Sequence, residues 1–343
     1  MPPLIFTNCT SEKSDDRGKI LENSFPNHDR KTMAPEVTVV VPISERHGRI
    51  GKLYKLYAEE LLRMGKQFEF IFVVDGHFSQ AYSDLKELRN AGHPIRIIKF
   101  AKHFGESAAL MEGFRQAKGG KILTLASYIQ IEPADLTKVF SAYDEGNDLV
   151  ITRRYPRKDP WVNRFQSFIY HFLVRRLTKA PFKDITSGMR LINSRVLSEF
   201  VLYGDLHRFI PIFALQRGIK VKEVIVSQRR EDTQVRLMAP GIYLRRALDI
   251  LTLFFLVKFT KKPLRFFGLI GSSFFLSGLT IALYLSILKL FFALALGNRP
   301  LLLLAILLIV FGIQIFSLGL IGELILFSHA KEISDYKIEE IIQ

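Results

Sequence analysis

Two hydrophobic runs near the C-terminus, residues 266–292 and 301–327, dominate the pattern of apolar and polar positions. Each is longer than the roughly 20 residues that a helix needs to cross the hydrocarbon core of a bilayer. Neither shows the period-2 alternation of a barrel strand, the other structure that satisfies its backbone within lipid. The runs therefore predict two transmembrane helices joined by a tight turn at residues 297–300. A buried helical hairpin of a soluble protein is the alternative that these lengths disfavour.

Upstream, short runs of β-branched and aromatic residues alternate with stretches that carry apolar residues at helical spacing. The runs predict buried strands over residues 37–42, 68–74, 95–100, 121–125, 148–152 and 219–226. The helical stretches predict helices over residues 49–64, 83–91, 106–117 and 165–177. A polar turn within residues 183–192 leads into one more short strand. This alternation is typical of a parallel, doubly wound α/β sheet with helices on both faces.

The carboxyl ends of the predicted strands define a candidate site before any motif is considered. Ligands of doubly wound sheets bind beside these ends. The ends that we expect to form the site are residues 42–45, 75–77, 102–105 and 126–130.

The same pattern divides the chain into five parts. We expect a tail without regular structure over residues 1–34, where Ser, Asp, Asn, Lys and Pro are frequent. Residues 35–240 form the α/β domain, and residues 241–262 form an amphipathic helix in the membrane interface. The two-helix hairpin covers residues 263–328, and a tail covers residues 329–343. An ordinary surface helix of the domain is the alternative for residues 241–262.

The net charge of +15 resides on the soluble part and its flanks, because the hydrophobic runs are nearly neutral. A basic surface of this kind suits anionic lipid or phosphorylated small molecules. Nucleic acid is not an expected partner, because no nucleic-acid-binding module is present. Lysines and arginines gather on the outer flanks of the hairpin, which places the domain and both termini in the cytoplasm by the positive-inside bias. Cys9 is the only cysteine, so no intrachain disulfide forms.

Several short motifs occur in order along residues 37–327. They are Val-Val-Val-Pro42, Asp75-Gly76, Phe104-Gly105-Glu106-Ser107, the segment 125–133, Ser187-Gly188-x-Arg190 and Gly319-x-x-Gly322-Glu323. In this order, and with the hairpin, they resemble the family 2 glycosyltransferases of GT-A fold. The resemblance is to the polyisoprenyl-phosphate glycosyltransferases that carry two C-terminal transmembrane helices, such as dolichol-phosphate mannose synthase and the undecaprenyl-phosphate sugar transferases.

The resemblance implies inverting transfer of a sugar from a nucleotide sugar to a polyisoprenyl phosphate at the cytoplasmic face. It implies that the nucleotide sugar is bound by Pro42, Ser44, Glu45, Asp75, Tyr128 and Gln130. Basic side chains would stabilise charge on the departing diphosphate. The expected catalytic residues are Lys102, Arg153, Arg230 and Arg236. Arg230 and Arg236 would also hold the lipid phosphate.

The chain departs from the family at its metal site. The family's Asp-x-Asp falls at Ala126-Ser127-Tyr128, and the first Asp of its Asp-Asp-Gly is Val74. A hard divalent cation prefers carboxylate oxygens, so no metal or other cofactor is expected. Two hypotheses follow: a metal-free enzyme that uses cations instead, or a domain that keeps the fold without the chemistry.

A third possibility is a Mg²⁺ or Mn²⁺ site rebuilt from Glu45, Asp75 or Glu132. The alternative function is a non-catalytic membrane protein that binds a lipid phosphate, a nucleotide or a partner glycosyltransferase. A homo-oligomer is possible because small residues, including Gly268, Gly271 and Gly278, occur in the first hydrophobic run.

Overall fold

The computed structural model describes most of the chain between residues 35 and 329. The described residues are 35–45, 47–159, 161–200, 202–229, 248, 250–254, 263–292 and 300–329. Both predicted tails, most of the predicted interface helix and most of the predicted hairpin turn lie outside these residues. Arg230 and Arg236 lie outside them as well.

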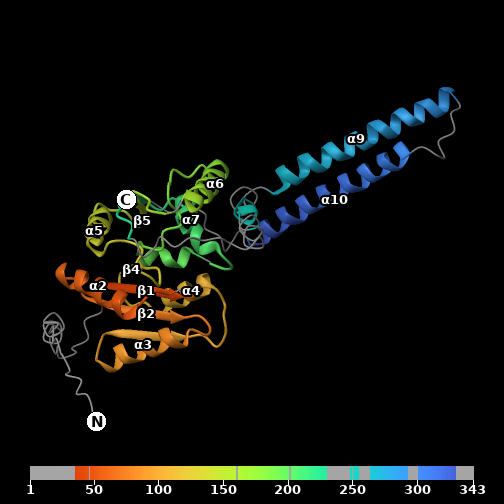
Figure 1. Cartoon of the computed structure of the whole chain (residues 1–343). Coiled ribbons are helices and arrows are strands. Elements are labelled where there is room, and N and C mark those ends of the chain that lie inside the picture. The colour runs from red at the N-terminus through yellow and green to blue at the C-terminus, as the bar shows by residue number, and fades with distance from the viewer. Residues whose placement is uncertain are drawn as a thin grey trace, which may run out of the picture. The chain divides into compact units, whose positions relative to one another are not determined.

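Within the described residues, seven strands form one sheet in the order β3-β2-β1-β4-β6-β5-β7. Figure 1 labels β2, β1, β4 and β5 of this sheet. The strands are β1 (Val37–Ile43), β2 (Phe68–Val74), β3 (Ile95–Lys99), β4 (Lys121–Thr124), β5 (Leu149–Arg154), β6 (Arg190–Asn193) and β7 (Val221–Val226). The predicted strands are thereby confirmed, with small differences at their ends. The sequence of β2, Phe-Glu-Phe-Ile-Phe-Val-Val, shows why, because aromatic and β-branched residues favour extended backbone.

The parallel arrangement is confirmed for β1 to β4, but the sheet as a whole is mixed. β6 runs antiparallel to both of its neighbours, β4 and β5. Its first residue, Arg190, pairs with Thr124 at the carboxyl end of β4. The polar turn over residues 184–189 therefore lies at the carboxyl edge of the sheet, and the chain enters β6 from that edge. A strand entered from the carboxyl edge must run against its parallel neighbours.

Helices cover both faces of the sheet, as predicted. One face carries α2 (Ile50–Arg63), α3 (Ser79–Asn90) and α5 (Leu136–Asp144). The other carries α4 (Glu106–Gln116), α6 (Trp161–Thr178) and α7 (Ile210–Gln216), with the 3₁₀ turns η2 (Ser194–Glu199) and η3 (Leu206–Phe209). The turn η1 (Pro133–Asp135) precedes α5. The pattern analysis did not predict α5 or α7.

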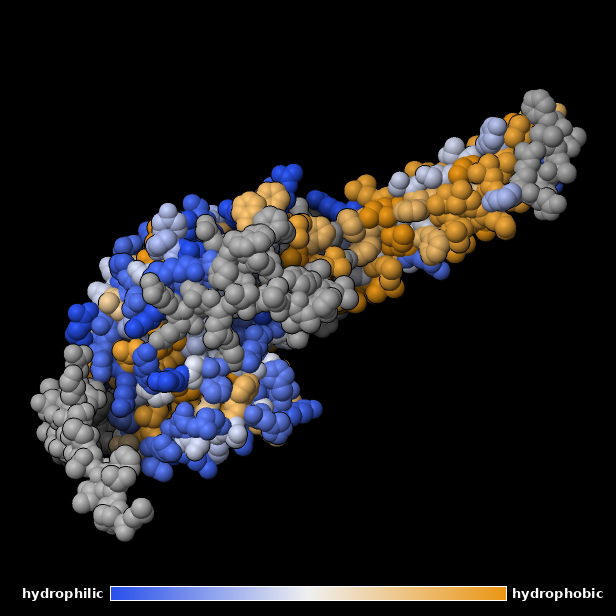
Figure 2. Space-filling view, viewed as in Figure 1, coloured by the Kyte–Doolittle hydropathy of each residue, from blue (hydrophilic) through white to orange (hydrophobic). Residues whose placement is uncertain are grey.

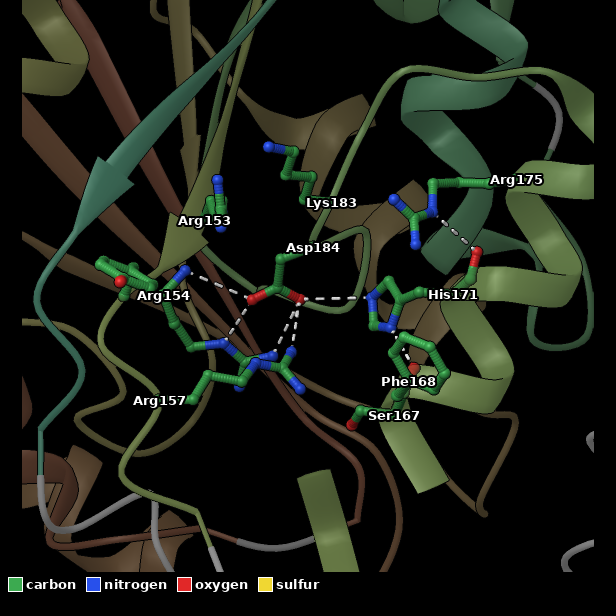
Figure 3. Close-up of a pocket in the computed structure, with 10 residues that line it drawn as sticks. Arg153, Arg154, Arg157, Ser167, Phe168, His171, Arg175, Lys183 and Asp184 are labelled. Atoms are coloured by element: carbon green, nitrogen blue, oxygen red, sulfur yellow. Dashed lines mark hydrogen bonds and ion pairs between the residues drawn. The ribbon is translucent and has the colours of Figure 1, made fainter. Parts of the chain in front are cut away.

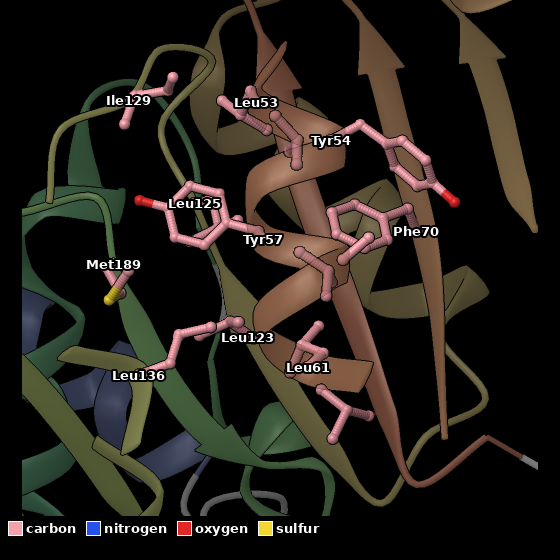
Figure 4. Close-up of a cluster of buried hydrophobic side chains, with 14 of the residues drawn as sticks. Leu53, Tyr54, Tyr57, Leu61, Phe70, Leu123, Leu125, Ile129, Leu136 and Met189 are labelled. Carbon is pink, nitrogen blue, oxygen red and sulfur yellow. The ribbon is translucent and has the colours of Figure 1, made fainter. Parts of the chain in front are cut away.

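Alternate residues of β1 explain the two-sided core. Val39 and Val41 face the core beneath α2, while Val40 faces the core beneath α4. Helix α2 contributes Tyr54 and Tyr57 from consecutive turns to the first core (Figure 4). A strand buried on both faces reads as a continuous apolar run, which is why β1 shows no alternation.

Two apolar helices, α9 (Pro263–Phe292) and α10 (Pro300–His329), confirm the two predicted hydrophobic helices. Each is long and apolar enough to cross a membrane, and Figure 2 shows their surface as mostly hydrophobic. Glycines allow their backbones to touch: a Cβ added at Gly312 would lie 2.5 Å from the backbone nitrogen of Phe275. Gly271 and Gly278 face α10 of the same chain in the same way. These glycines are therefore occupied within the hairpin, and association between chains would need another surface.

We expect loss of the hydroxyl to have different effects on the stability of the domain at the two core tyrosines of α2. The Tyr57 hydroxyl donates to the carbonyl of Ile131 at 2.9 Å, so Tyr57→Phe should lower the free energy of unfolding by about 1 kcal/mol. The Tyr54 hydroxyl is buried with no hydrogen-bond partner in the described part of the chain. Tyr54→Phe should therefore be neutral or stabilising. Chemical denaturation in detergent measures both, and equal losses would contradict the assignment.

Candidate active site

The carboxyl ends of β1, β4 and β5 lie along one edge of the sheet, together with the turn that leads into β6. Every predicted site residue that the structure describes belongs to this edge or to a loop beside it. The edge therefore defines the candidate site, as the topology predicts.

Residues 126–130, where the resemblance leads us to expect a metal motif, are bound to the turn before β6. The buried Gln130 accepts a hydrogen bond at 2.9 Å from the backbone N–H of Gly188, and its amide donates to the Tyr128 hydroxyl at 3.2 Å. A Cβ added at Gly188 would lie 3.1 Å from Ala126. Gln130 thus crosslinks two loops of the edge, and Tyr128 lies within that network.

The loop after β1 joins the same edge. Pro42 and Ser44 are buried, whereas Glu45 is largely exposed and pairs with Arg208 at 3.6 Å. The backbone N–H of Gly48 donates to the carbonyl of Ser127 at 2.8 Å, which ties this loop to residues 126–130.

A second polar cluster lies where α4 begins. His207 contacts Glu106 at 3.4 Å and the Ser107 hydroxyl at 3.1 Å, and its carbonyl accepts from Arg190. Burial raises the pKa of Glu106, but the contacts with His207 and the charges of Arg208 and Arg190 outweigh it and bring the pKa to about 2. The cluster holds η3 against α4 and keeps a carboxylate ionised at the site edge.

Asp75 organises the loop between β3 and α4. Its carboxylate is fully buried and accepts hydrogen bonds from the backbone N–H groups of Phe104 at 2.7 Å and Gly105 at 2.8 Å. It also pairs with His103 at 2.9 Å. Gly105 has φ +99°, a conformation that favours glycine, and α4 starts directly after it. Asp75 therefore positions this loop, and direct contact with a nucleotide stays a prediction.

Lys102 lies on the same loop and is exposed, with its ammonium 5.2 Å from the centre of the Phe104 ring. It does not line the pocket described next. Its role against a diphosphate stays a prediction.

A basic pocket of about 580 Å³ lies at the end of β5 (Figure 3). Four arginines and one lysine line it, namely Arg153, Arg154, Arg157, Arg175 and Lys183. Asp184 is its one lining carboxylate. Helix α6 supplies the opposite wall with Ser167, Phe168 and His171. Excess positive charge in a partly enclosed space favours a phosphorylated ligand.

Asp184 sets the geometry of this pocket. Arg154 binds both of its oxygens, at 2.8 and 3.0 Å, and Arg157 approaches at 3.0 Å. His171 lies 3.6 Å away. Burial raises the pKa of Asp184, but Arg154, His171 and Arg157 outweigh it, so its pKa lies well below the usual range. One carboxylate thus fixes two guanidinium groups and leaves the pocket positive.

The structure brings only part of the predicted set together. Arg153 lines the arginine pocket, while Tyr128 and Gln130 join the turn before β6. The sequence analysis did not select most of the other residues that line this pocket, among them Arg157, Arg175, Lys183 and Asp184. The spacing of arginines after β5 carried a usable signal, because several buried guanidinium groups require a buried carboxylate nearby.

The described residues do not fit a divalent metal ion. Ala126 and Tyr128 supply no carboxylate, and no group of three or more His, Cys, Asp and Glu side chains in the described ranges is placed to hold a cation. Asp75 is engaged by backbone N–H groups, and Glu132 pairs with Arg229 at 3.5 Å. A rebuilt metal site from these residues therefore has no support in the geometry.

Asp184→Asn should destabilise the domain strongly, because Arg154 and Arg157 would lose their buried counter-charge. We expect the free energy of unfolding to fall by about 3–5 kcal/mol. Asp144→Asn is the matched control, since Asp144 pairs with Lys121 at an exposed position and should cost about 1 kcal/mol or less. Denaturation in detergent at neutral pH measures both, and equal effects would contradict the role of Asp184.

The buried carboxylate of Asp184 should also make the stability of the domain depend on pH. The folded pKa of Asp184 is depressed, so its contribution is fully present above the unfolded value of about 3.9 and is lost as the pH falls further. Below about pH 4, the wild type should therefore lose stability more steeply than Asp184→Asn.

Comparison with known proteins identifies the domain. Residues 38–201 match the model for glycosyl transferase family 2. Dodecaprenyl-phosphate galacturonate synthase of Rhizobium johnstonii is 25% identical over 295 residues, which cover 84% of this chain and 87% of that protein. Undecaprenyl-phosphate 4-deoxy-4-formamido-L-arabinose transferase of Proteus mirabilis is 25% identical over 315 residues, which cover 90% of this chain and 94% of that protein.

Among solved structures, mannosyl-3-phosphoglycerate synthase from Rubrobacter xylanophilus superposes with a TM-score of 0.51 and 12% identity, covering 64% of this chain and 74% of that one. A likeness at this identity concerns the fold alone, and it confirms a GT-A-like mixed α/β sheet. The family that the motifs indicate is also confirmed, because residues 38–201 form a glycosyl transferase family 2 domain.

Proposed function

We propose that this chain transfers a sugar from a nucleotide sugar to a polyisoprenyl phosphate at a membrane surface. The observation that carries the proposal is the arginine pocket, which lies at the sheet edge where such folds bind ligands. The names of the two relatives support it, since both are transferases or synthases that act on polyprenyl phosphates and match over most of their length.

The arginine pocket suits the phosphate of the acceptor. Arg154 is held by Asp184, so its guanidinium is fixed before any ligand arrives. Arg153 and Arg157 add charge from the same wall. Guanidinium groups form strong, charge-assisted hydrogen bonds to phosphate oxygens, and a prearranged group loses little entropy on binding. We therefore place the lipid phosphate here, and Arg230 and Arg236 stay predicted contributors.

The reaction needs charge stabilisation more than a base. A phosphate monoester is ionised near neutral pH, so its oxygen attacks the anomeric carbon without prior proton removal. A bond forms between that oxygen and the carbon, while the bond from the carbon to the diphosphate breaks. The nucleoside diphosphate leaves with the electron pair, and attack from the opposite side inverts the anomeric centre. Nearby cations stabilise the departing charge.

Residues 126–130 contain no carboxylate side chain that could bind a metal ion, which supports transfer without a bound metal. The expected substitutes are side-chain cations, among them Lys102 on the β3–α4 loop and Arg153 at the end of β5. Arginine and lysine keep their charge near neutral pH and can stabilise a diphosphate directly. A non-catalytic, ligand-binding role is the alternative that the lost Asp-x-Asp motif brings, and the assay below separates the two.

The chain is a membrane protein in this proposal. Helices α9 and α10 serve as two spans, and the basic flanks place the domain and both termini on the cytoplasmic side. A lipid acceptor and a dissolved nucleotide sugar then meet at one surface.

Chelation is the first test. Purified protein incubated with labelled nucleotide sugars and an isoprenyl phosphate should form glycolipid at a rate that EDTA changes by less than about twofold, because no metal-bound group takes part. A relative with an intact Asp-x-Asp motif serves as the positive control for chelation. Activity that EDTA abolishes and Mg²⁺ restores would contradict metal-free transfer. Binding of substrates without turnover for any donor would support the alternative.

Arg157→Gln should weaken the binding of the lipid substrate and leave the binding of the nucleotide sugar unchanged. Loss of one charged hydrogen bond to phosphate, about 1.5–3 kcal/mol, should raise KM for the isoprenyl phosphate roughly 10- to 100-fold. KM for the nucleotide sugar should change little. Arg63→Gln, on the exposed side of α2, is the control that should leave both values unchanged. A larger effect on the nucleotide sugar would place the diphosphate, rather than the lipid, in the pocket.

A further inference from the structure

Gln314 is a polar side chain in the middle of the long apolar helix α10. It lies at the midpoint of Pro300–His329, about 20 Å along the helix from either end. The hydrocarbon core of a bilayer is about 30 Å thick, so in a membrane-spanning α10 this amide lies far from the headgroups and from water. Its hydrogen-bond partners must therefore come from protein.

The side chain of Gln314 faces away from α9. Helix α10 approaches α9 at Gly312 and at Gly319, where an added Cβ would lie 3.0 Å from Phe267. Gln314 follows Gly312 by two positions, which is about 200° around the helix. Its side chain is exposed, and its amide forms no hydrogen bond within the part of the chain that the structure describes. The hairpin alone therefore leaves this amide unsatisfied.

Hydroxyl side chains of the same two helices are satisfied locally. Ser277 donates to the carbonyl of Ser273 at 2.8 Å. Ser317 donates to the carbonyl of Ile313 at 2.9 Å. A hydroxyl can bond in this way to the carbonyl one turn before it, so these residues need no partner outside their own helix. The amide of Gln314 makes no such contact, and an unpaired amide in hydrocarbon costs free energy, so its position indicates a partner outside the hairpin.

Exposed apolar side chains extend this face of α10 in both directions from Gln314. They recur at alternating intervals of four and three residues, and they are Leu307, Phe311, Leu318, Ile321 and Ile325. This spacing is the heptad repeat of helices that pack along their length with a left-handed twist. We call these residues, together with Gln314, the outer seam of α10.

A second copy of the same chain is the partner that matches the outer seam. Copies inserted with the same topology run parallel, so each places Gln314 at the same depth. In a parallel pair of helices, identical heptad positions face one another. A carboxamide carries both a donor and an acceptor, so two Gln314 side chains can satisfy each other across a two-fold axis. Lipid chains cover apolar residues equally well but offer the amide no hydrogen bond.

We propose that two copies of this chain associate in the membrane along the outer seam of α10, with their Gln314 amides hydrogen-bonded to one another. This surface is distinct from the glycines that pack α9 and α10 within one hairpin. The amide pair sets the register of the two helices, as a single polar residue does within an apolar seam. The contact does not rest on the proposed function, so association without sugar transfer would leave it standing.

Cysteine crosslinking tests the position of the contact. Full-length protein with Cys9→Ser and Ile321→Cys is reconstituted at low density in phosphatidylcholine vesicles and oxidised. Leu320→Cys in the same background is the matched control, because residues 321 and 320 are similarly exposed, at 54% and 48%, but lie about 100° apart around the helix. A disulfide needs Cα atoms within about 7 Å, so dimers should form at least about fivefold faster through residue 321. Equal rates, or no crosslinking at either position, would overturn the proposal.

Gln314→Leu tests the amide itself. Energy transfer between labelled copies of the full chain in vesicles measures the dissociation constant of the dimer. Loss of the hydrogen bonds between helices should raise this constant about 3- to 20-fold. Ser277→Ala is the control and should change it by less than about twofold, because that hydroxyl bonds within its own helix. A dissociation constant that Gln314→Leu leaves unchanged, or a wild type that stays monomeric, would overturn the proposal.

Discussion

The buried contact of Asp184 with Arg154 and Arg157 is the interaction on which the site depends. Two guanidinium groups at the end of a strand repel one another and cannot be buried without a counter-charge. Asp184 supplies that charge from the turn before β6, and Glu223 on β7 holds the turn by accepting from the backbone N–H groups of Lys183 and Asp184. The pocket is thereby fixed before any ligand binds. Its remaining charge is available for an anion.

The loop over residues 126–130 is bound to the same turn. Ala126 packs beside Gly188, and Gln130 ties the same loop to the same turn. The loop over residues 126–130 is therefore part of the scaffold beside the turn that leads into β6. Arginine and lysine side chains concentrate positive charge at the same edge of the sheet. A transferase needs charge stabilisation at this edge, and the source of that charge can differ.

Much of the fold could be predicted from the sequence, and the reasons lie in particular residues. Strand β2 matches its prediction at both ends because a seven-residue run, aromatic or β-branched except at Glu69, ends sharply at Asp75-Gly76. The apolar helices α9 and α10 were evident from length alone. The direction of β6 could not be predicted, because the sequence of a four-residue strand does not indicate its orientation. The orientation follows from the position of the preceding turn. Helix α7, seven residues long, is too short for its period to be recognised.

The candidate site was predicted less completely than the fold. Strand ends gave its location, and Arg153 was found there. Asp184 was seen only as part of a turn, because a carboxylate more than 25 residues from its arginine partners gives no local signal. The contact of Asp75 with a nucleotide stays a prediction, whereas its hydrogen bonds to the β3–α4 loop were not predicted. Such roles depend on tertiary contacts, and a single sequence does not show them.

An experimental structure with an isoprenyl phosphate bound tests the central claim most directly. The account predicts phosphate oxygens within hydrogen-bond distance of Arg154 or Arg157, with Asp184 still bound to both guanidinium groups and the isoprenoid chain leaving past Phe168. A phosphate bound elsewhere, with the arginine pocket empty or filled by the nucleotide diphosphate, would contradict it.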